Sequence, residues 1–549
     1  MSFLDDIFER LAAAPQTRVL YERHDEASAS GVSGTALLKQ VAQARAFLRK
    51  LGLKKGERCA LLAHNGIDWV AADLAIMAEG LIVVPLYARQ APAELVSMMK
   101  DCSPALLVCG DAGLRDGIVK EWPQAPQQVL FSEFFTAGDG VHQKPLVAES
   151  DPVAIIYTSG TSGEAKGVVL TAKNIGHMLG CTSGRLDILM EGHTGQERVF
   201  HYLPLCFAGS WMLLLTSLLR RSLVALNTDL TKLSGDMSEA EPDYFLNVPA
   251  LLERMRKAID EQLVKAGGFP LTVYSRAKAA SVRQQEGEAT FSDSVWMWLA
   301  KTAIFPTIRK KMIGGNLKAL ICGSAPLSVE TQLYFMMLGI PVLQGYGLTE
   351  TTALCTLDDP RDVEPGRVGP AIPGVEMKLG ENEEIIVRGP NIFPGYWNRP
   401  EETSKTLRDG WFHTGDQGET DAKGNWKIAG RIKNLIILGS GHNIAPEPIE
   451  EKILEQLPGA QQVVLVGNGR GYLSAIVTGP VSSEKVQKAL DVVNPGLPHY
   501  KQVRAFQIAP EALSIENGLL TANGKLKRDL IAKRFAGEIE EMYRVRQAV

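Results

Sequence analysis

The sequence lacks the features that mark secreted, membrane-spanning and nucleic-acid-binding proteins. Its seven cysteines in 549 residues are an odd number with no CxxC pair, which argues against a disulfide scaffold or a zinc site and fits a reducing compartment. No stretch approaches the roughly 20 apolar residues of a membrane-spanning helix, and the start MSFLDDIFERLAAAP lacks the basic and apolar regions of a signal peptide. With 58 Lys and Arg against 62 Asp and Glu, no basic excess points to nucleic acid as a partner. We therefore expect a soluble, cytoplasmic protein.

Short apolar runs alternate with helical patterns over the first two thirds of the chain. The helical patterns include WVAADLAIMAEG and PAELVSMMKDC. This alternation predicts parallel sheets covered by helices. At roughly 150 residues per domain, the length predicts three or four structural units. The apolar runs cover residues 58–65, 81–87, 105–110, 153–160, 223–227, 317–323 and 341–347.

Three later regions have different sequence patterns. Residues 357–430 have Gly and Pro turns around strand candidates at 383–389 and 424–430, which predicts a small antiparallel element or distorted barrel. Beyond Gly430, strands QQVVLVG and LSAIVTG alternate with helical segments, as in a compact α+β domain. Residues 262–315 read as a helical insertion. The predicted class is α/β, with two stacked subdomains, a small β-rich subdomain and an α+β C-terminal domain.

A loop rich in Gly, Ser and Thr follows one apolar strand directly. In YTSGTSGEAKG the glycines allow a tight turn and close approach to a ligand. Backbone N–H groups, hydroxyls and a lysine can together bind a polyphosphate. The spacing differs from that of a Walker A loop, and a solvated turn is the less favoured alternative. The candidate phosphate-binding residues are Thr158, Ser159, Gly160, Thr161, Ser162, Gly163 and Lys166.

Five motifs in order make the sequence resemble the adenylate-forming superfamily, which includes acyl-CoA synthetases, peptide synthetase adenylation domains and firefly luciferase. The resemblance covers about residues 30 to 535, and its closest match is to long-chain fatty acyl-CoA synthetases. It implies ATP, Mg²⁺ and CoA as cofactor and substrates. The motifs are TSGTSGEAKG, QGYGLTE (344–350), GWFHTGD (410–416), GRIKNLIILGSGHNIAPEPIE (430–450) and LTANGKLKR (520–528).

The second motif carries groups suited to a nucleotide and a metal. Tyr346 offers an aromatic face for a purine, Thr349 offers a hydroxyl to phosphate, and Glu350 offers a hard oxygen to magnesium. Alone, the motif also fits a strand-end turn with the tyrosine in the core. The resemblance adds Gly347 to the nucleotide site. It also places the loop GSAPLS against adenine, through Gly323, Ser324 and Ala325.

Three charged residues complete the predicted adenylation site. Asp416 can accept hydrogen bonds from ribose hydroxyls, and Arg431 can donate to ribose or phosphate. A surface salt bridge is the alternative for each of them. The resemblance gives Lys525 contacts with the acid carboxylate and the α-phosphate, where a positive charge screens the anions that react. From composition alone, Lys525 would be interpreted as an exposed lysine in a basic stretch.

The resemblance also implies a rotating C-terminal domain. Lys433 matches the hinge between an adenylation domain, residues 1–431, and a lid domain, residues 432–549. Rotation there would present Lys525 for the first half-reaction and the loop GSGHNIAP for the second. Gly439 and Gly441 would flank the pantetheine tunnel. His442 stands where the family often has glutamate, so the detailed contacts of the tunnel differ.

The acyl pocket is predicted around Phe207 and Gly209 in HYLPLCFAGSW. Phe207 replaces the family's usual histidine and can serve as a wall, or be an ordinary core aromatic. His201 reads as structural. The segments FAGSWMLLL and LNVPAL are apolar, which suits a fatty chain.

The predicted reaction has two steps: the acid and ATP·Mg²⁺ give acyl-AMP and pyrophosphate, and CoA then takes the acyl group. The alternative acceptor is the phosphopantetheine of a carrier protein. A catalytically dead binding protein of the same fold is less favoured because the motifs are intact. A luciferase-like oxygenase is a remote third alternative. The run WMWLAKTAIF fits a buried helix, the commoner case, or peripheral contact with a membrane.

Overall fold

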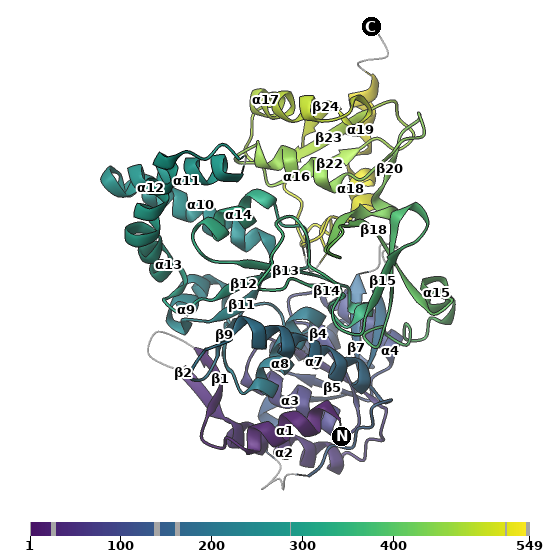
Figure 1. Ribbon diagram of the computed structural model, residues 1–549. Helices are drawn as coiled ribbons and strands as arrows, with labels where there is room; N and C mark the ends of the chain where they lie inside the picture. Colours follow the sequence, from purple (N-terminus) through teal and green to yellow (C-terminus); the bar gives the residue numbers. More distant parts are fainter. Residues whose placement is uncertain are drawn as a thin grey trace.

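The computed structural model describes residues 2–23, 29–136, 143–159, 165–285, 287–521 and 524–544, and of Ser159 only the backbone. It confirms the predicted α/β class. Two large sheets with their helices form the body, a small antiparallel sheet packs beside them, and an α+β unit lies against one end (Figure 1).

The first large sheet has six strands in the order β6-β5-β3-β4-β7-β8. All neighbours are parallel except β7 and β8, which form an antiparallel pair. The helix α3 (Ile67–Ala78) packs with β3 and β4 and is buried on nearly every side, as its mostly apolar sequence, in which Asp68 and Asp73 are the charged residues, requires. The strands are β3 (Arg58–Ala63), β4 (Ile82–Tyr87), β5 (Leu106–Cys109), β6 (Gln127–Leu130), β7 (Pro152–Ser159) and β8 (Ala165–Thr171). Further helices of this part are α2 (Gly34–Lys50), α4 (Pro92–Cys102), α5 (Ala112–Glu121) and α6 (Phe131–Phe134).

The second large sheet has eight strands in the order β14-β13-β12-β11-β9-β10-β1-β2. Its interior pairs are parallel, and the two edge pairs are antiparallel. Its strands are β1 (Arg18–Arg23), β2 (Ala29–Ser33), β9 (Arg198–His201), β10 (Leu223–Leu226), β11 (Tyr244–Asn247), β12 (Ala319–Cys322), β13 (Val342–Tyr346) and β14 (Thr356–Leu357).

Helices join the two large sheets through one hydrophobic core. They are α1 (Phe3–Ala12), α3, α7 (Ala172–Leu189) and α8 (Ala208–Arg220), and their apolar residues share a cluster with strands of both sheets. Within it, the indole N–H of Trp211 in α8 donates to the Asp73 carboxylate in α3 at 2.9 Å. This contact fixes α8, whose first turn borders the predicted acyl pocket.

A small antiparallel sheet carries two of the predicted site residues. Its strands are β15 (Glu376–Leu379), β16 (Glu384–Arg388), β17 (Leu407–Arg408), β18 (Trp411–Thr420) and β19 (Trp426–Arg431). The helix α15 (Pro400–Thr406) lies beside it. The sheet's β18–β19 hairpin contains Asp416 and Arg431.

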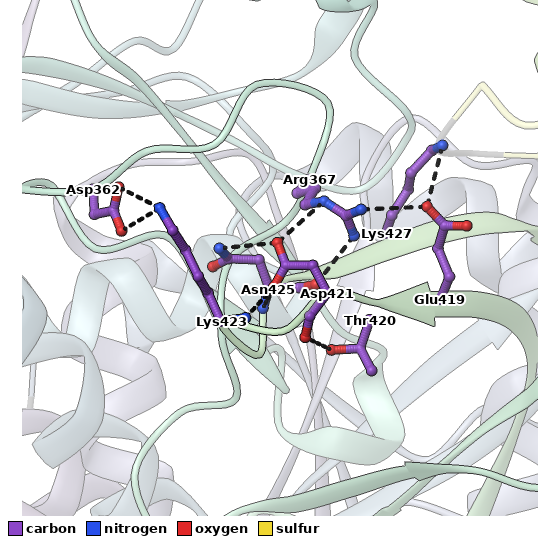
Figure 2. Close-up of polar contacts among 8 residues, drawn as sticks. All are labelled: Asp362, Arg367, Glu419, Thr420, Asp421, Lys423, Asn425 and Lys427. Atoms are coloured by element: carbon purple, nitrogen blue, oxygen red, sulfur yellow. Dashed lines mark hydrogen bonds and ion pairs between the residues drawn. The ribbon is translucent and has the colours of Figure 1, made fainter.

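The turn of that hairpin is fastened to a neighbouring loop (Figure 2). Arg367 donates from Nη1 to the backbone oxygen of Asn425 at 3.2 Å, and its Nε lies 3.4 Å from Asp421 Oδ2. Lys423 pairs with Asp362 at 3.2 Å. Because these contacts hold the turn at several points, the strands behind it have a defined position.

The helical insertion is confirmed, but it begins earlier than predicted. It comprises α10 (Pro249–Ala266), α11 (Gly268–Gln285), α12 (Phe291–Leu299), a π-helical turn (Ala300–Ile304) and α13 (Phe305–Ile313). The segment LLERMRKAIDEQ continues α10 without a break, and Pro249 stands in its first turn, where proline is accepted. These helices form a lobe at one side of the body (Figure 1).

The C-terminal part has its own cores, one on each face of a three-stranded sheet. Arg528 donates two hydrogen bonds to the buried carboxylate of Glu450, at 2.7 and 2.6 Å. This pair fixes the segment that follows Lys525. The strands are β20 (Ile436–Ile437), β21 (Asn443–Ile444), β22 (Gln462–Val466), β23 (Leu473–Thr478) and β24 (Val503–Ile508), and the helices α16 (Glu447–Glu455), α17 (Ser483–Val493), α18 (Arg528–Arg534) and α19 (Ala536–Arg544).

Candidate active site

Asp416 and Arg431 face each other across the β18–β19 hairpin. They are register partners, and Arg431 Nε lies 2.7 Å from Asp416 Oδ1. The hydroxyl of Tyr346, at the end of β13, donates to Asp416 Oδ2 at 2.6 Å. Burial raises the pKa of Asp416, while the nearby charges of Arg431 and Lys525 and the Tyr346 hydroxyl oppose that rise. A buried carboxylate is thus held between a cation and a hydroxyl.

Lys525, from the C-terminal part, lies close enough to this carboxylate for the two charges to interact. A turn holds it, in which the Thr521 N–H donates to the Lys525 backbone oxygen at 2.8 Å. Desolvation and the charge of Arg431 lower the pKa of Lys525, while Asp416 and Glu350 act in the opposite direction. The residue as a whole is exposed. The structure therefore brings together residues predicted from four separate motifs.

Glu350 lies in a short turn (Thr349–Thr351) just beyond β13. The hydroxyl of Tyr396 donates to its Oε1 at 2.8 Å. The described residues contain no group of three or more His, Cys, Asp or Glu that could hold a metal. Magnesium bound to a nucleotide needs no such group, because one or two carboxylates, phosphate oxygens and water complete its shell. A single carboxylate at Glu350 fits that donor set.

Lys166 is joined to the same network by residues that the sequence analysis missed. Its Nζ lies 2.5 Å from Glu402 Oε2 and 5.4 Å from the ring centroid of Tyr396. Tyr396 thus lies between Lys166 and Glu350. Tyr396 and Glu402 both occur in the segment FPGYWNRPEETSKT, between two of the motifs.

The phosphate loop is described only at its two ends. Thr158 and Ser159 end β7 and Lys166 lies in β8, where it is the register partner of Thr158. Gly160, Thr161, Ser162 and Gly163 lie outside the described residues.

Two further loops leave neighbouring strands at the same edge of the second sheet. Gly323 and the exposed Ser324 and Ala325 follow β12, and Gly347 follows β13. A Cβ at Gly347 would stand 2.1 Å from the backbone oxygen of Ala353, so only glycine fits there. Ligands in open α/β sheets bind beyond the carboxyl ends of the strands, which is where these loops lie.

The predicted tunnel residues contact the C-terminal part, and the predicted hinge lies where the chain enters that part. Lys433 lies in a turn (Ile432–Asn434) directly after β19. The Gly439 N–H donates to the Arg470 backbone oxygen at 2.7 Å, and Gly441 has a φ of 83°. The ring of His442 stacks on Tyr500 with centroids 4.2 Å apart. The glycine loop therefore contacts its own C-terminal part, while Lys525 lies at the site.

Phe207 and Gly209 stand at the start of α8. The Phe207 ring lies 5.5 Å from that of Tyr87. At Gly209, an added Cβ would meet only Leu246, at 3.8 Å. Nearby apolar side chains from α7, α8, β9 and β11 form a cluster of Leu186, Met190, Val199, Leu213 and Tyr244, with Leu246 packed against it.

His201 has the structural position that the sequence predicted. Its Nε2 lies 2.6 Å from the hydroxyl of Ser210, which links β9 to α8. Burial lowers the pKa of His201 to about 4, so the ring is neutral at physiological pH.

Two family models match the chain. One, described as AMP-binding enzyme, matches residues 8–397, and the other, AMP-binding enzyme C-terminal domain, matches residues 433–547. The chain is 27% identical to the long-chain-fatty-acid–CoA ligase FadD15 of Mycobacterium bovis, over 96% of this chain and 94% of that one. It is 29% identical to long-chain-fatty-acid–CoA ligase 6 of Rattus norvegicus, over 88% of this chain and 78% of that one.

Solved structures confirm the fold. ATP-bound MatB from Rhodopseudomonas palustris matches with a TM-score of 0.75 and 23% identity, over 97% of this chain and 99% of that one. The o-succinylbenzoate–CoA synthetase MenE of Bacillus subtilis, with ATP and magnesium, matches with a TM-score of 0.74 and 21% identity, over 95% and 98%. At these identities the likeness concerns the fold alone.

Proposed function

Because the chain belongs to the AMP-binding enzyme family, we propose that it is an AMP-forming acyl-CoA synthetase whose acid is a medium- or long-chain fatty acid. The observation that carries this proposal is the convergence of Lys525 with Asp416, Arg431 and Glu350. In the first step, a carboxylate oxygen of the acid bonds to the α-phosphorus of ATP. The bond from that phosphorus to pyrophosphate breaks at the same time.

Each of these residues has a defined task in that step. Lys525 screens the negative charge shared by the carboxylate and the α-phosphate, which would otherwise repel each other. Asp416 accepts from the ribose hydroxyls, and Arg431 orients it. Glu350 would hold the magnesium ion, which supplies further charge neutralisation at the phosphates. Lys166 and the loop that follows Ser159 at the end of β7 bind the polyphosphate.

Three observations support a fatty acid as the substrate. The surroundings of Gly209 are apolar. No Asp or Glu stands in residues 207–215, where an amino group of the substrate would need one. The relatives FadD15 and ligase 6 bear long-chain-fatty-acid names. Structures named for o-succinylbenzoate and anthranilate share this fold, so the fold alone does not identify the acid.

In the second step, the sulfur of CoA attacks the acyl carbon and AMP leaves. We propose that residues 432–549 rotate about Lys433 between the steps, so that the Gly439–Gly441 loop replaces Lys525 at the site. The turn at Ile432–Asn434 is where the chain passes from the small sheet to the C-terminal part, so a change of backbone angles there moves the whole C-terminal part.

The test is acid-dependent release of pyrophosphate with fatty acids of graded length, with and without CoA. We expect release to peak with medium or long chains, and thioester to form only with CoA. Lys525→Ala should slow adenylation by about 100-fold or more. Lys533→Ala is the matched control, because Lys533 is exposed in the same basic stretch.

Two results would contradict the proposal. Acyl-AMP formation without a thioester on CoA would make a carrier-protein phosphopantetheine the acceptor. Absence of pyrophosphate release with every acid, while ATP still binds, would leave a nucleotide-binding protein without this activity.

A further inference from the structure

Exposed apolar side chains gather on the helical lobe formed by α10 to α13. Among the described residues, six of the sixteen exposed large apolar side chains lie in residues 249–313. Three are aromatic, and these would be costly to leave in water without a partner. The six are Val264 (65% exposed), Phe269 (64%), Val282 (48%), Phe291 (86%), Val295 (43%) and Trp298 (64%).

Three of these side chains form a stripe along α12. Phe291, Val295 and Trp298 follow the spacing i, i+4, i+7, which places them on one face of a helix. The opposite face is anchored, because the buried carboxylate of Asp293 accepts from Arg283 Nε at 3.1 Å and from the Thr290 N–H at 2.9 Å. A firmly held helix therefore presents an apolar stripe to its surroundings.

The lobe is basic although the protein is not. Residues 249–313 contain eleven Lys and Arg against six Asp and Glu, whereas the whole chain has 58 against 62. Two of those acids, Asp260 and Asp293, are already paired with Lys278 and Arg283. Exposed lysines follow the stripe in the sequence: Lys301 comes one turn after Trp298, and Lys310 and Lys311 lie in the last turn of α13.

We propose that this lobe docks on a bilayer surface that contains anionic lipids, with α12 lying in the headgroup region. An aromatic and aliphatic stripe with exposed lysines close to it in the sequence has the chemistry of an interfacial helix, in which apolar side chains enter the bilayer and lysines contact lipid phosphates. Figure 1 shows α12 at the outer edge of the lobe, away from the C-terminal part. The contact is peripheral, since no helix in the described ranges is long and apolar enough to cross a membrane.

A second copy of the chain is a poorer occupant for the same stripe. Two such lobes brought face to face would bury lysines against lysines, which is repulsive. An anionic surface turns the same lysines into attraction. The proposal is independent of the identity of the acid.

The test is flotation of the purified full chain with vesicles. One set has equal parts of phosphatidylcholine and phosphatidylglycerol, and the other has phosphatidylcholine alone. The double variant Phe291→Ser/Trp298→Ser removes the stripe. Its control is Leu379→Ser/Val492→Ser, which removes two exposed apolar side chains elsewhere. The charge pair is Lys310→Gln/Lys311→Gln, and its control is Lys485→Gln/Lys488→Gln on α17.

We expect the wild type to float with the anionic vesicles and far less with the neutral ones. The stripe variant should bind the anionic vesicles about tenfold more weakly or worse, and the Lys310/Lys311 variant several-fold more weakly, while both controls bind as wild type. All variants should keep the wild-type circular dichroism and the activity towards a water-soluble acid. Equal binding by the stripe variant and wild type, or no binding to either vesicle, would overturn the proposal. So would a wild-type dimer that the stripe variant dissociates, if vesicle binding is unchanged.

Discussion

Lys166 Nζ and Glu402 Oε2 lie 2.5 Å apart and join the strand after the phosphate loop to the helix α15. The neighbouring charges of Lys166 and then Lys405 lower the pKa of Glu402 to about 2. Glu402 is therefore ionised at physiological pH. In the proposed function Lys166 binds a nucleotide phosphate, so Glu402 would compete with that phosphate and ATP binding would weaken this ion pair.

We expect Glu402→Gln to lower the KM for ATP roughly threefold to tenfold, because the competing charge is lost while the helix remains. The steady-state ATP dependence of pyrophosphate release measures this effect. Glu401→Gln, an exposed neighbour on the same helix, should leave KM unchanged. A rise in KM for Glu402→Gln would show instead that Glu402 positions Lys166 for the phosphate.

Tyr346 provides a second test of the site. Tyr346→Phe keeps the ring and removes the hydroxyl that donates to Asp416 at 2.6 Å. Because a buried carboxylate oxygen then lacks a partner, we expect a loss of about 1–3 kcal/mol in unfolding free energy and a KM for ATP raised about tenfold. Urea unfolding and ATP titration of the rate measure the two effects.

Tyr472→Phe is the matched control for that experiment. It removes a hydroxyl that donates to the Met542 backbone oxygen at 3.0 Å, within the C-terminal part. Its stability should fall by a similar or smaller amount without any change in KM for ATP. An unchanged KM in Tyr346→Phe would contradict the role given to Asp416.

Much of the fold could be predicted because the apolar strands are short and bounded by glycine and proline. The run at residues 58–65, for example, became β3 (Arg58–Ala63). The edge strand β8 was not predicted, since AKGVVLT reads as the end of a ligand loop. The early start of α10 was not predicted because many polar residues separate the apolar residues of the face that packs on the body.

Some residues of the candidate site could likewise be predicted from the sequence, and others could not. Asp416, Arg431 and Lys525 could be proposed because each lies in a compact motif, and the structure brings them together. Tyr396 and Glu402 could not, because they reach Lys166 only through long-range pairing. The backbone N–H of Trp397 donates to the Gly167 backbone oxygen at 2.8 Å, so the segment with Tyr396 lies along the edge of β8. No local sequence pattern reveals this long-range pairing.

Gly209 offers a test of chain-length selection. Gly209→Leu should fit α8, because among the described residues the new Cβ would meet Leu246 alone, at 3.8 Å. If the acyl chain passes this point, the larger side chain shortens the space. We then expect kcat/KM for long chains to fall at least about tenfold relative to medium chains. Competition between two acids of different length measures the ratio.

Gly180→Leu is the control, because this exposed helix glycine has no atom within 4 Å of an added Cβ. It should leave the ratio of long to medium chains unchanged. An unchanged ratio in Gly209→Leu would mean that the acyl chain lies elsewhere.

Asp73 predicts a pH dependence of stability. It is fully buried in α3, its Oδ2 accepts from Trp211, and its Oδ1 has no partner among the described residues. Burial raises the pKa of Asp73 to about 7, whereas the pKa of an aspartate in the unfolded chain is about 3.9. The folded state thus binds a proton that the unfolded state has released. Protonation of Asp73 therefore stabilises the folded state. This contribution to the free energy of unfolding is complete below the pKa of the unfolded chain and is lost as the pH rises through the folded-state pKa of about 7.

Asp73→Asn keeps an acceptor for Trp211 and cannot ionise, so it should not lose stability in this way. Between about pH 5 and about pH 8, we expect the wild type to lose about 2–4 kcal/mol of unfolding free energy relative to the variant. Asp358, whose pKa burial also raises to about 7, is present in both proteins and cancels in the difference. Urea unfolding across this range measures the effect, with the exposed Asp491→Asn as control. Parallel curves for wild type and Asp73→Asn would mean that Asp73 keeps the same charge throughout the range, and that the buried contact with Trp211 is not sensitive to pH.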